Sequence, residues 1–326
     1  MKDKLLKLLQ ENHDNYLSGE SMSESFNVSR TAIWKHINNL RKEGYVIESI
    51  TNRGYKLIKD STNITSAGIS AKLSTKLLGK DIICLDEVGS TNDYAKSLAI
   101  SGAKDGTLII ADQQNKGRGR MGRIWSSAKG KGIWMTLLLR PSIEPQKAQI
   151  ITLAASVAVV QALQPLLGER VKVKWPNDVL VDGKKICGIL TEMSCELENI
   201  NYIVLGIGIN VNQVVNDFPE EIRETATSIN AILNNLEDID RLSIIADILK
   251  AFEELYLLIL EGKTDKVISN WRLFSCTLGR KIRVSSLNGD LCGIAEDITE
   301  DGVLILKDNS GKIHRIFSGE IFFNMG

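Results

Sequence analysis

One segment restricts what this chain can fold into more than any other: residues 115–132 read NKGRGRMGRIWSSAKGKG. This segment, the basic loop, holds six lysines and arginines, five glycines and no acidic residue. Six like charges so close together repel one another unless an anion neutralises them. Glycine lets backbone N–H groups approach a ligand, and arginine matches the geometry of phosphate and carboxylate groups. The pattern predicts an anion-binding loop, with a solvated basic loop as the alternative.

Gly117, Gly119 and Gly122 also match the G-x-G-x-x-G pattern of dinucleotide-binding turns. Such a turn needs a helix that starts within it and an acidic residue about 20 positions later. Residues 125–132 are polar and glycine-rich instead, and arginines crowd a turn that requires bare backbone. A Rossmann dehydrogenase is therefore the weaker alternative.

The remaining composition argues against several classes of protein. The chain has 326 residues, enough for two or three domains, and its 40 basic residues balance 40 acidic ones. Five dispersed cysteines without a C-x-x-C pair suit a reducing cytoplasm, and three scattered histidines argue against a histidine metal site. Charges interrupt the first residues, unlike a signal peptide. The apolar stretch Ile150–Leu163 is shorter than a membrane span, so we expect a buried helix and a cytoplasmic protein without membrane contact.

Residues 1–63 predict a small helical module closed by a β-hairpin, which would bind DNA. A helix is expected over Arg30–Lys42, with Ser29 as its N-cap and an apolar face turned inward. The side chains expected to face bases and phosphates are Arg30, Thr31, Lys35, Asn38 and Lys42 on this helix and Arg53 in the hairpin. A solvated helix in a dimerisation module is the alternative. Lys59–Ser66 is polar and is expected to be a linker.

Residues 67–272 alternate between strand-like and helical patterns, and residues 273–326 contain short strands at regular spacing. The first range predicts a mixed α+β catalytic domain, and the second predicts a small β-barrel. Strands are expected at 81–86, 107–112, 133–140, 171–175, 179–181, 184–190 and 202–212, and helices at 92–100, 146–167 and 241–261. Strands in the last range are expected at 281–285, 292–298, 303–307 and 313–317. Asp182-Gly183 is a signal for a two-residue hairpin turn.

The strand expected over Val204–Asn212 has one face of large apolar residues and a second face with Gly206, Gly208 and Asn210. Glycines inside a strand often mark a place where another group comes close to the backbone. A ligand on this face explains the pattern. Packing against another backbone element is the alternative.

Three further groups carry polar chemistry. The segment Lys174–Asp178 ends a strand in a proline-fixed turn, where Asn177 and Asp178 can form hydrogen bonds or bind Mg²⁺. Lys185, on the next hairpin strand, is either an active-site charge or a surface lysine. Ser90 or Thr91 can cap the helix that follows, and a helix N-terminus favours an anion or a ligand carbonyl.

Together these motifs resemble the bifunctional biotin–protein ligases that also repress biotin-synthesis genes. The resemblance covers nearly the whole chain, and the matching motifs are Ser90–Asn92, Gly117–Arg123 with Trp125, Lys174–Asp178, Lys184–Gly188, Gly206–Asn210 and Gly319–Ile321. It implies a multidomain α+β protein: a winged helix-turn-helix, a central domain like those of class II aminoacyl-tRNA synthetases, and a C-terminal SH3-like β-barrel. The domains would span residues 1–63, 67–272 and 273–326.

The resemblance also implies roles for individual residues. Contacts with biotin or its adenylate are expected from Ser90, Thr91, Asn92, Gln114, Gly117, Arg118, Gly119, Arg120, Lys185, Gly206 and Gly208. Contacts with the adenine and phosphates of ATP are expected from Arg123, Trp125, Asn177 and Asn210, and Asp178 is the candidate ligand of Mg²⁺. Asp217–Ile229 resembles a second loop that closes over the adenylate.

The implied reaction has two steps. The biotin carboxylate attacks the α-phosphorus of Mg–ATP, which gives biotinyl-5′-AMP and pyrophosphate. A lysine of the biotin carboxyl carrier protein then attacks the mixed anhydride. Two anions meet in the first step, so Lys185, Arg118 and Arg120 are assigned to neutralise the charge. Loops that close over the intermediate would exclude water.

The N-terminal module implies regulation. A homodimer formed on ligand binding would hold operator DNA, with biotinyl-5′-AMP as corepressor. Two alternatives stay open at this point. One is a transcription factor whose large domain only senses a small anion, and the other is a lipoate or octanoate ligase.

Overall fold

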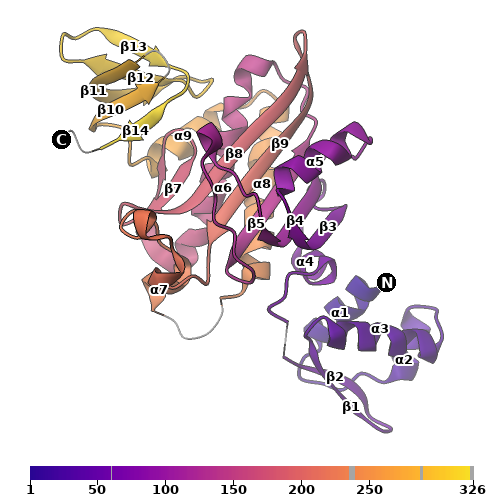
Figure 1. Cartoon of the computed structure of the whole chain (residues 1–326). Coiled ribbons are helices and arrows are strands. Elements are labelled where there is room, and N and C mark those ends of the chain that lie inside the picture. Colours follow the sequence, from indigo (N-terminus) through magenta and orange to yellow (C-terminus); the bar gives the residue numbers. More distant parts are fainter. Residues whose placement is uncertain (60, 235–238, 287–288, 324–326) are drawn as a thin grey trace. The chain divides into compact units, whose positions relative to one another are not determined.

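Figure 1 shows the computed structural model of the chain, which describes residues 1–59, 61–234, 239–286 and 289–323. The chain forms two compact units: residues 1–74 with 238–246, and residues 75–237 with 247–326. Asp60, within the predicted linker, lies outside the described residues. The division into three domains at residues 63–67 and 272–273 stays a prediction.

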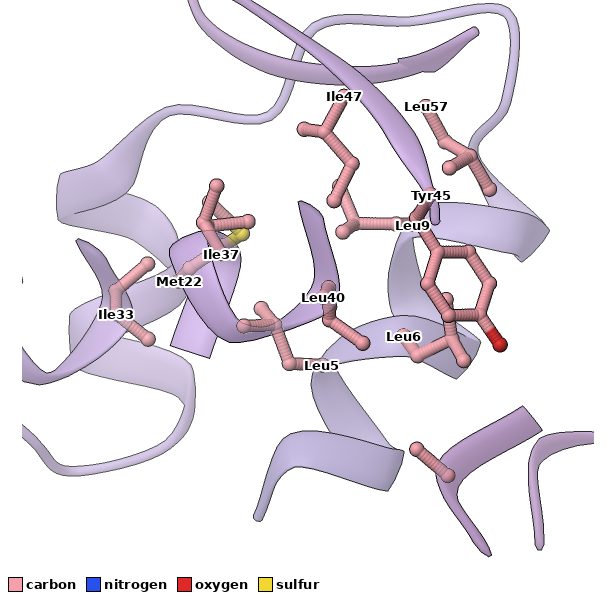
Figure 2. Packing of buried hydrophobic residues seen from close by; sticks show 11 residues of the cluster. Leu5, Leu6, Leu9, Met22, Ile33, Ile37, Leu40, Tyr45, Ile47 and Leu57 are labelled. Atoms are coloured by element: carbon pink, nitrogen blue, oxygen red, sulfur yellow. The ribbon is translucent and has the colours of Figure 1, made fainter. Parts of the chain in front are cut away.

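The first unit contains a helical core and a β-hairpin. Its elements are α1 (Lys2–Glu11), α2 (Gly19–Ser25), α3 (Arg30–Lys42), β1 (Val46–Ile50), β2 (Gly54–Lys59) and α4 (Ser66–Lys72). Figure 2 shows its apolar core, which includes the inward face of α3 formed by Ile33, Ile37 and Leu40. The predicted cap of α3 is confirmed, because Ser29 Oγ accepts a hydrogen bond from the Ala32 N–H at 3.1 Å. The sequence pattern does not predict α4, whose seven residues are too few to show a helical period.

The second unit is built on a seven-stranded sheet with the order β3-β4-β5-β9-β8-β7-β6. Its strands are β3 (Ile82–Val88), β4 (Thr107–Gln114), β5 (Gly132–Leu139), β6 (Val171–Lys174), β7 (Asp178–Val181), β8 (Lys184–Glu196) and β9 (Asn199–Asn210). Only β3 and β4 pair in parallel; the other neighbours in this sheet are antiparallel. The predicted hairpin is confirmed: β7 and β8 join through Asp182 and Gly183, whose φ angles are 51° and 82°.

Helices α5 (Thr91–Ile100) and α6 (Gln149–Leu167) cover opposite faces of this sheet, as the strand register shows. Residues paired across neighbouring strands point to the same face. Glu192 pairs with Val204, and Thr191 pairs with Leu205. Glu192 accepts hydrogen bonds from side chains of α5, whereas Thr191 contacts Thr152 of α6 at 2.7 Å. The predicted alternation of β9 is therefore confirmed, and its two glycines lie on the α5 face.

Helix α6 is apolar over most of its surface, and 14 of its 19 residues are buried. The stretch Pro145–Arg170 is long and apolar enough to cross a membrane by length and composition, but 78% of its most apolar window lies inside the protein. The buried helix expected over Ile150–Leu163 is thus confirmed. The remaining helices are α7 (Ile229–Leu233), α8 (Arg241–Leu260) and α9 (Asp265–Phe274).

The C-terminal strands form a five-stranded antiparallel sheet with the order β13-β12-β11-β10-β14. They are β10 (Lys281–Ser286), β11 (Gly289–Ile298), β12 (Leu304–Asp308), β13 (Ile313–Ile316) and β14 (Glu320–Phe322). The sequence pattern predicts the first four and misses the three-residue β14. The turn after β6 anchors this region: the Trp175 N–H donates to Thr277 Oγ1 at 3.0 Å, and its indole Nε1–H donates to the Gly302 carbonyl at 3.1 Å. The Trp175–Pro176 peptide bond is cis.

Candidate functional site

The basic loop folds back on itself as an irregular hairpin. The Gln114 N–H donates to the Ser127 carbonyl at 3.1 Å, and the Trp125 N–H donates to the Gly117 carbonyl at 2.9 Å. Nearer the tip, the Gly119 N–H donates to the Arg123 carbonyl at 2.7 Å. The only helical turn within residues 115–132, all of them described, is a three-residue 3₁₀ turn. The dinucleotide-binding turn, which needs a helix here, is therefore excluded.

Three cations of the basic loop each pair with an acidic residue from another element. Arg118 pairs with Asp93 of α5, and Arg123 pairs with Glu320 of β14. Lys131 Nζ lies 2.8 Å from Asp217 Oδ2, in the segment after β9. The hydrogen bond from Arg123 is the main reason why the pKa of Glu320 is lowered. The protein itself therefore relieves much of the self-repulsion of this loop.

Arg120 is held differently. Its Nη1–H donates to the Gly319 carbonyl at 3.2 Å and lies 3.4 Å from Asn177 Oδ1. Burial lowers the pKa of its guanidinium, and the charges of Asp178 and Glu320 oppose that shift. Arginine stays protonated under these conditions. Arg120 is thus a desolvated cation bound to neutral oxygens, an arrangement that attracts an anion strongly.

Lys185 contacts both Asp178 and Trp125. Its Nζ is 2.6 Å from Asp178 Oδ1 and 5.3 Å from the ring centre of Trp125. Its backbone joins the segment Asp217–Ile229: the Lys185 N–H donates to the Thr225 carbonyl at 2.7 Å, and the Thr227 N–H donates to the Lys185 carbonyl at 2.9 Å. Lys185 is therefore paired and partly buried beside Trp125, and its role as an active-site charge stays a prediction.

The glycines of β9 make room for two side chains. A Cβ atom on Gly206 would lie 2.3 Å from Asn92 Oδ1, and one on Gly208 would lie 2.5 Å from Trp125 Nε1. Real Cβ atoms do not approach so closely, so any larger residue would displace these groups. The Trp125 Nε1–H is buried and has no hydrogen-bond partner in the described part of the chain. The close approach that the glycines predict is therefore made by Asn92 and Trp125.

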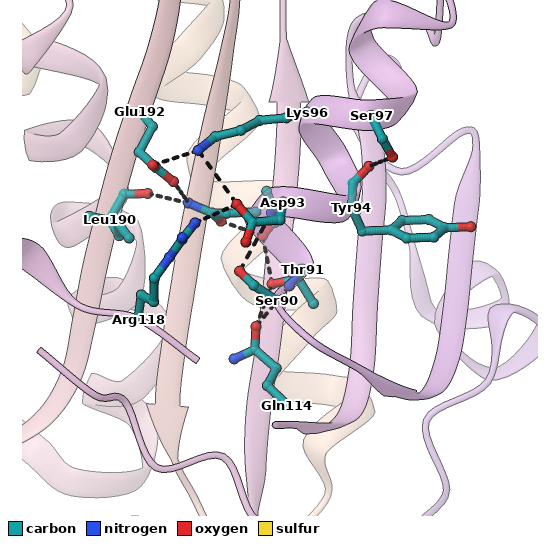
Figure 3. Close-up of polar contacts among 12 residues, drawn as sticks. Ser90, Thr91, Asp93, Tyr94, Lys96, Ser97, Gln114, Arg118, Leu190 and Glu192 are labelled. Carbon is teal, nitrogen blue, oxygen red and sulfur yellow. Dashed lines mark hydrogen bonds and ion pairs between the residues drawn. The ribbon is translucent and has the colours of Figure 1, made fainter. Parts of the chain in front are cut away.

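Figure 3 shows the polar network at the start of α5. Ser90 is the N-cap, and its Oγ accepts from the Asp93 N–H at 3.5 Å. Gln114 Oε1 accepts from the Thr91 N–H at 2.9 Å and from Thr91 Oγ1 at 3.0 Å. The Asn92 amide bridges Thr136 Oγ1, at 2.7 Å, and Glu192 Oε2, at 2.8 Å. These bonds fix the side chains from which the family resemblance implies contacts with biotin, and those contacts stay predictions.

Asn177 and Asn210 are engaged within the protein. Asn177 Nδ2–H donates to the Ile189 carbonyl at 2.8 Å. Asn210 is buried; its Nδ2–H donates to the Thr227 carbonyl at 3.0 Å, and its Oδ1 accepts from Gln213 at 3.0 Å. Both amides orient neighbouring backbone, and their contacts with ATP stay predictions.

The structure thus gathers the expected residues around the ends of β4, β7, β8 and β9, and adds residues to which the sequence analysis assigns no contact with a ligand. These additions are Asp93, Lys96, Ser127, Lys131, Thr136 and Glu192. Thr136 carries a recognisable signal, because it is the one polar side chain in the eight-residue apolar strand Gly132–Leu139. Asp93 and Lys96 resemble any exposed helix charge.

In the first unit, α3 exposes the face expected to read DNA. Arg30, Thr31, Lys35, Lys42 and Arg53 are exposed, and Asn38 is half-buried. Arg30 pairs with Glu20, the Arg53 guanidinium lies 4.9 Å from the ring centre of Tyr16, and Asn38 Oδ1 accepts from Arg41 at 3.3 Å. Lys35 and Lys42 form no ion pair with any described residue, so their charges face solvent.

Comparisons with known proteins agree with this arrangement. Residues 85–210 match the biotin/lipoate A/B protein ligase family, residues 2–56 match an HTH domain, and residues 277–324 match the biotin protein ligase C terminal domain. The bifunctional ligase/repressor BirA of Bacillus subtilis (strain 168) is 42% identical over 97% of this chain and 97% of its own length. The protein of the same name from Escherichia coli (strain K12) is 28% identical over 98% and 95%.

Among solved structures, the biotin protein ligase from Aquifex aeolicus in complex with biotin and ATP is 31% identical, with a TM-score of 0.63. The match covers 74% of this chain and 98% of that protein. The second unit therefore has the biotin ligase fold, with an HTH domain before it and a domain of strands at its end. The chain belongs to the BirA family of bifunctional ligase/repressor proteins.

Proposed function

We propose that this protein is an ATP-dependent biotin–protein ligase that forms biotinyl-5′-AMP and transfers biotin to a lysine of the biotin carboxyl carrier protein. We also propose that it represses biotin genes in response to biotin. The observation that carries the ligase proposal is the cluster of Lys185, Arg120 and Trp125. It combines two cations with an indole whose buried N–H has no described partner.

The first step joins a carboxylate to a phosphate, so its transition state gathers negative charge. Lys185 and Arg120 would stabilise this charge, and Arg118 would hold the carboxylate of biotin. Ser90, Thr91, Asn92 and Gln114 would bind the rest of biotin, since their polar atoms converge at the start of α5. The indole ring of Trp125 would lie against the adenine of the bound nucleotide.

Asp178 is the carboxylate that this site offers to Mg²⁺. Within the described residues, no three His, Cys, Asp or Glu side chains gather at one point. Mg²⁺ is commonly held by one or two carboxylates together with the phosphates of its nucleotide, and a single aspartate fits that pattern. When bound, the ion would supply positive charge to the phosphates.

Two segments would close over the adenylate: the basic loop and Asp217–Ile229. The ion pair between Lys131 and Asp217 links them, so they would move together and exclude water from the mixed anhydride. At the finer level we propose a synthetase-like catalytic domain, an SH3-like C-terminal barrel and a cytoplasmic location.

Repression would rest on the N-terminal unit as a winged helix-turn-helix, with α3 in the major groove and Arg53 in the wing. Biotinyl-5′-AMP would act as corepressor by favouring a homodimer that matches a two-fold operator. The exposed Lys35 and Lys42 support this role, because uncompensated cations bind phosphates.

Biotin-dependent exchange of pyrophosphate into ATP tests the ligase proposal. We expect exchange with biotin and none with lipoate. Tight biotin binding without exchange would leave only a sensor of a small anion, and exchange driven by lipoate would identify a lipoate ligase.

Fluorescence anisotropy with a palindromic operator tests the repressor proposal. We expect binding to strengthen when biotin and ATP are added together, and to weaken with salt as counterions are released. Equal affinity with and without the two ligands would contradict the corepressor role.

A further inference from the structure

Two arginines of the basic loop are held by carboxylates in different ways. Arg123 donates from both Nη1 and Nη2 to the two carboxylate oxygens of Glu320. The described contact of Arg118 uses Nη2 alone, with one oxygen of Asp93. A guanidinium carries five N–H donors in a planar fork. Arg123 is therefore held at both terminal nitrogens and keeps three N–H donors, whereas Arg118 is held at one corner and keeps four for a second anion.

Asp93 also contacts Lys96, which in turn pairs with Glu192 (Figure 3). Lys96 Nζ lies 3.6 Å from Asp93 Oδ1 and 2.6 Å from Glu192 Oε1. The other oxygen of Glu192 accepts from Asn92 Nδ2 at 2.8 Å. The four charged side chains sum to zero. Lys96 thus remains beside Asp93 when Arg118 also binds a ligand, and Glu192 of β8 holds Lys96 in place.

Asp93 also lies on the helix whose first residues are assigned to biotin. Ser90 Oγ accepts from the Asp93 N–H, so the cap, the carboxylate and Arg118 form one unit at the start of α5. An arginine tied to this unit has a fixed position relative to the polar groups around Thr91 and Gln114. A free arginine on a glycine-rich loop would lose more side-chain entropy when it binds an anion.

We propose that Asp93 is a positioning residue: it holds Arg118 by one nitrogen, so that the remaining donors meet the carboxylate of biotin, and Lys96 and Glu192 brace it. This inference rests on the proposed ligase function. Asp93 would then raise the affinity for the carboxylate of biotin by positioning Arg118. Ser90, Thr91 and Gln114 would bind the neutral part of biotin.

The experiment compares biotin with biotin methyl ester, which lacks the negative charge. Calorimetric titration of the full chain with Asp93→Ala should show about a 5-fold loss of affinity for biotin, the upper value for one exposed charge pair. Affinity for the ester should stay within about 2-fold. In ATP–pyrophosphate exchange, KM for biotin should rise by the same factor as Kd, and kcat should stay nearly constant. Asp93→Asn keeps an acceptor oxygen and should lose about 2-fold.

A double-mutant cycle supplies the test of mechanism. In an Arg118→Ala background, Asp93→Ala should have no further effect on biotin binding, since Asp93 acts through Arg118. The matched control is Asp290→Ala, which removes the pair with Arg283. The side chains there are 44% and 41% exposed, against 50% and 41% for Asp93 and Arg118. It should change neither affinity.

Three outcomes would overturn the proposal. Tighter biotin binding by Asp93→Ala would show that Asp93 competes with the substrate. Equal losses for biotin and its ester, with a lower Tm, would show a merely structural role, and an unchanged biotin affinity would show no role. These results differ from failure of the ligase proposal, in which the unsubstituted protein shows no biotin-dependent exchange.

Discussion

The basic loop and helix α3 are both rich in cations, but they differ in how many are paired: three in the loop, and on α3 only Arg30 among the described residues. In the basic loop, Arg118, Arg123 and Lys131 pair with carboxylates from three different elements. On α3, Lys35 and Lys42 face solvent. Cations in fixed pairs have a defined geometry and suit one small ligand. Cations on a solvated face suit a long polyanion, whose binding depends on charge more than on position.

The largest effect should come from Lys185, which is paired within the site. Lys185→Ala should lower the rate of ATP–pyrophosphate exchange about 100- to 1000-fold, as the loss of one preorganised charge does in other enzymes. The free energy of unfolding should fall by only about 1–2 kcal/mol, measured by urea denaturation.

The neighbouring Lys184 supplies the control for that change. Its Nζ lies 3.9 Å from Glu224, and its side chain is 44% exposed. Lys184→Ala should leave exchange within about 2-fold. Equal losses of exchange rate in Lys184→Ala and Lys185→Ala would contradict the proposal that Lys185 is catalytic and Lys184 is a surface residue.

Removing the exposed cations of α3 should have a smaller effect, and on operator binding instead of catalysis. Replacing Lys35 and Lys42 together by alanine should weaken operator binding about 10-fold at moderate salt and lower the salt slope by up to about 2, because each lysine neutralises about one phosphate. Anisotropy titrations at several salt concentrations measure both quantities. Lys7→Ala, on the exposed side of α1, is the control. An unchanged slope in the double variant would contradict the proposed DNA face.

The smallest effect should come from the pair between Arg123 and Glu320. Hydrogen bonding by Arg123 lowers the pKa of the Glu320 carboxyl in the folded protein. The stability that this pair supplies is therefore present above the ordinary glutamate pKa and is lost as the pH falls through the lowered value. Glu320→Gln should reduce the free energy of unfolding by about 1 kcal/mol at pH 7, and by less as the solution becomes acidic.

Urea denaturation between pH 7 and pH 3 measures this difference. Glu254→Gln, an exposed change on α8, should have little effect at any of these pH values. A difference that grows as the pH falls would show that Glu320 is not stabilised as an anion, and that the loop cation Arg123 is not truly paired.

Much of the fold follows from local pattern. Alternation predicts the strands of the large sheet, and the turn signal Asp182-Gly183 predicts the β7–β8 hairpin. The seven-residue α4 and the three-residue β14 escape, because so few residues do not establish a period. The strand predicted over 184–190 ends six residues before β8 does, and the strand predicted over 202–212 starts three residues after β9 begins, because these outer ends are polar and half-exposed. The second prediction also runs two residues past the end of β9.

The basic loop shows where local pattern stops. Its residues alone predict that anions neutralise it, because charge density and glycine content are properties of the chain. Which anion each cation meets is decided by the fold. Asp93, Asp217 and Glu320 lie 25, 86 and 197 residues from their partners, so only tertiary structure brings them together. The sequence by itself thus determines the kinds of chemistry that the chain can perform. The tertiary structure alone decides which charges are already paired and which remain for a ligand, because pairing depends on distance in space.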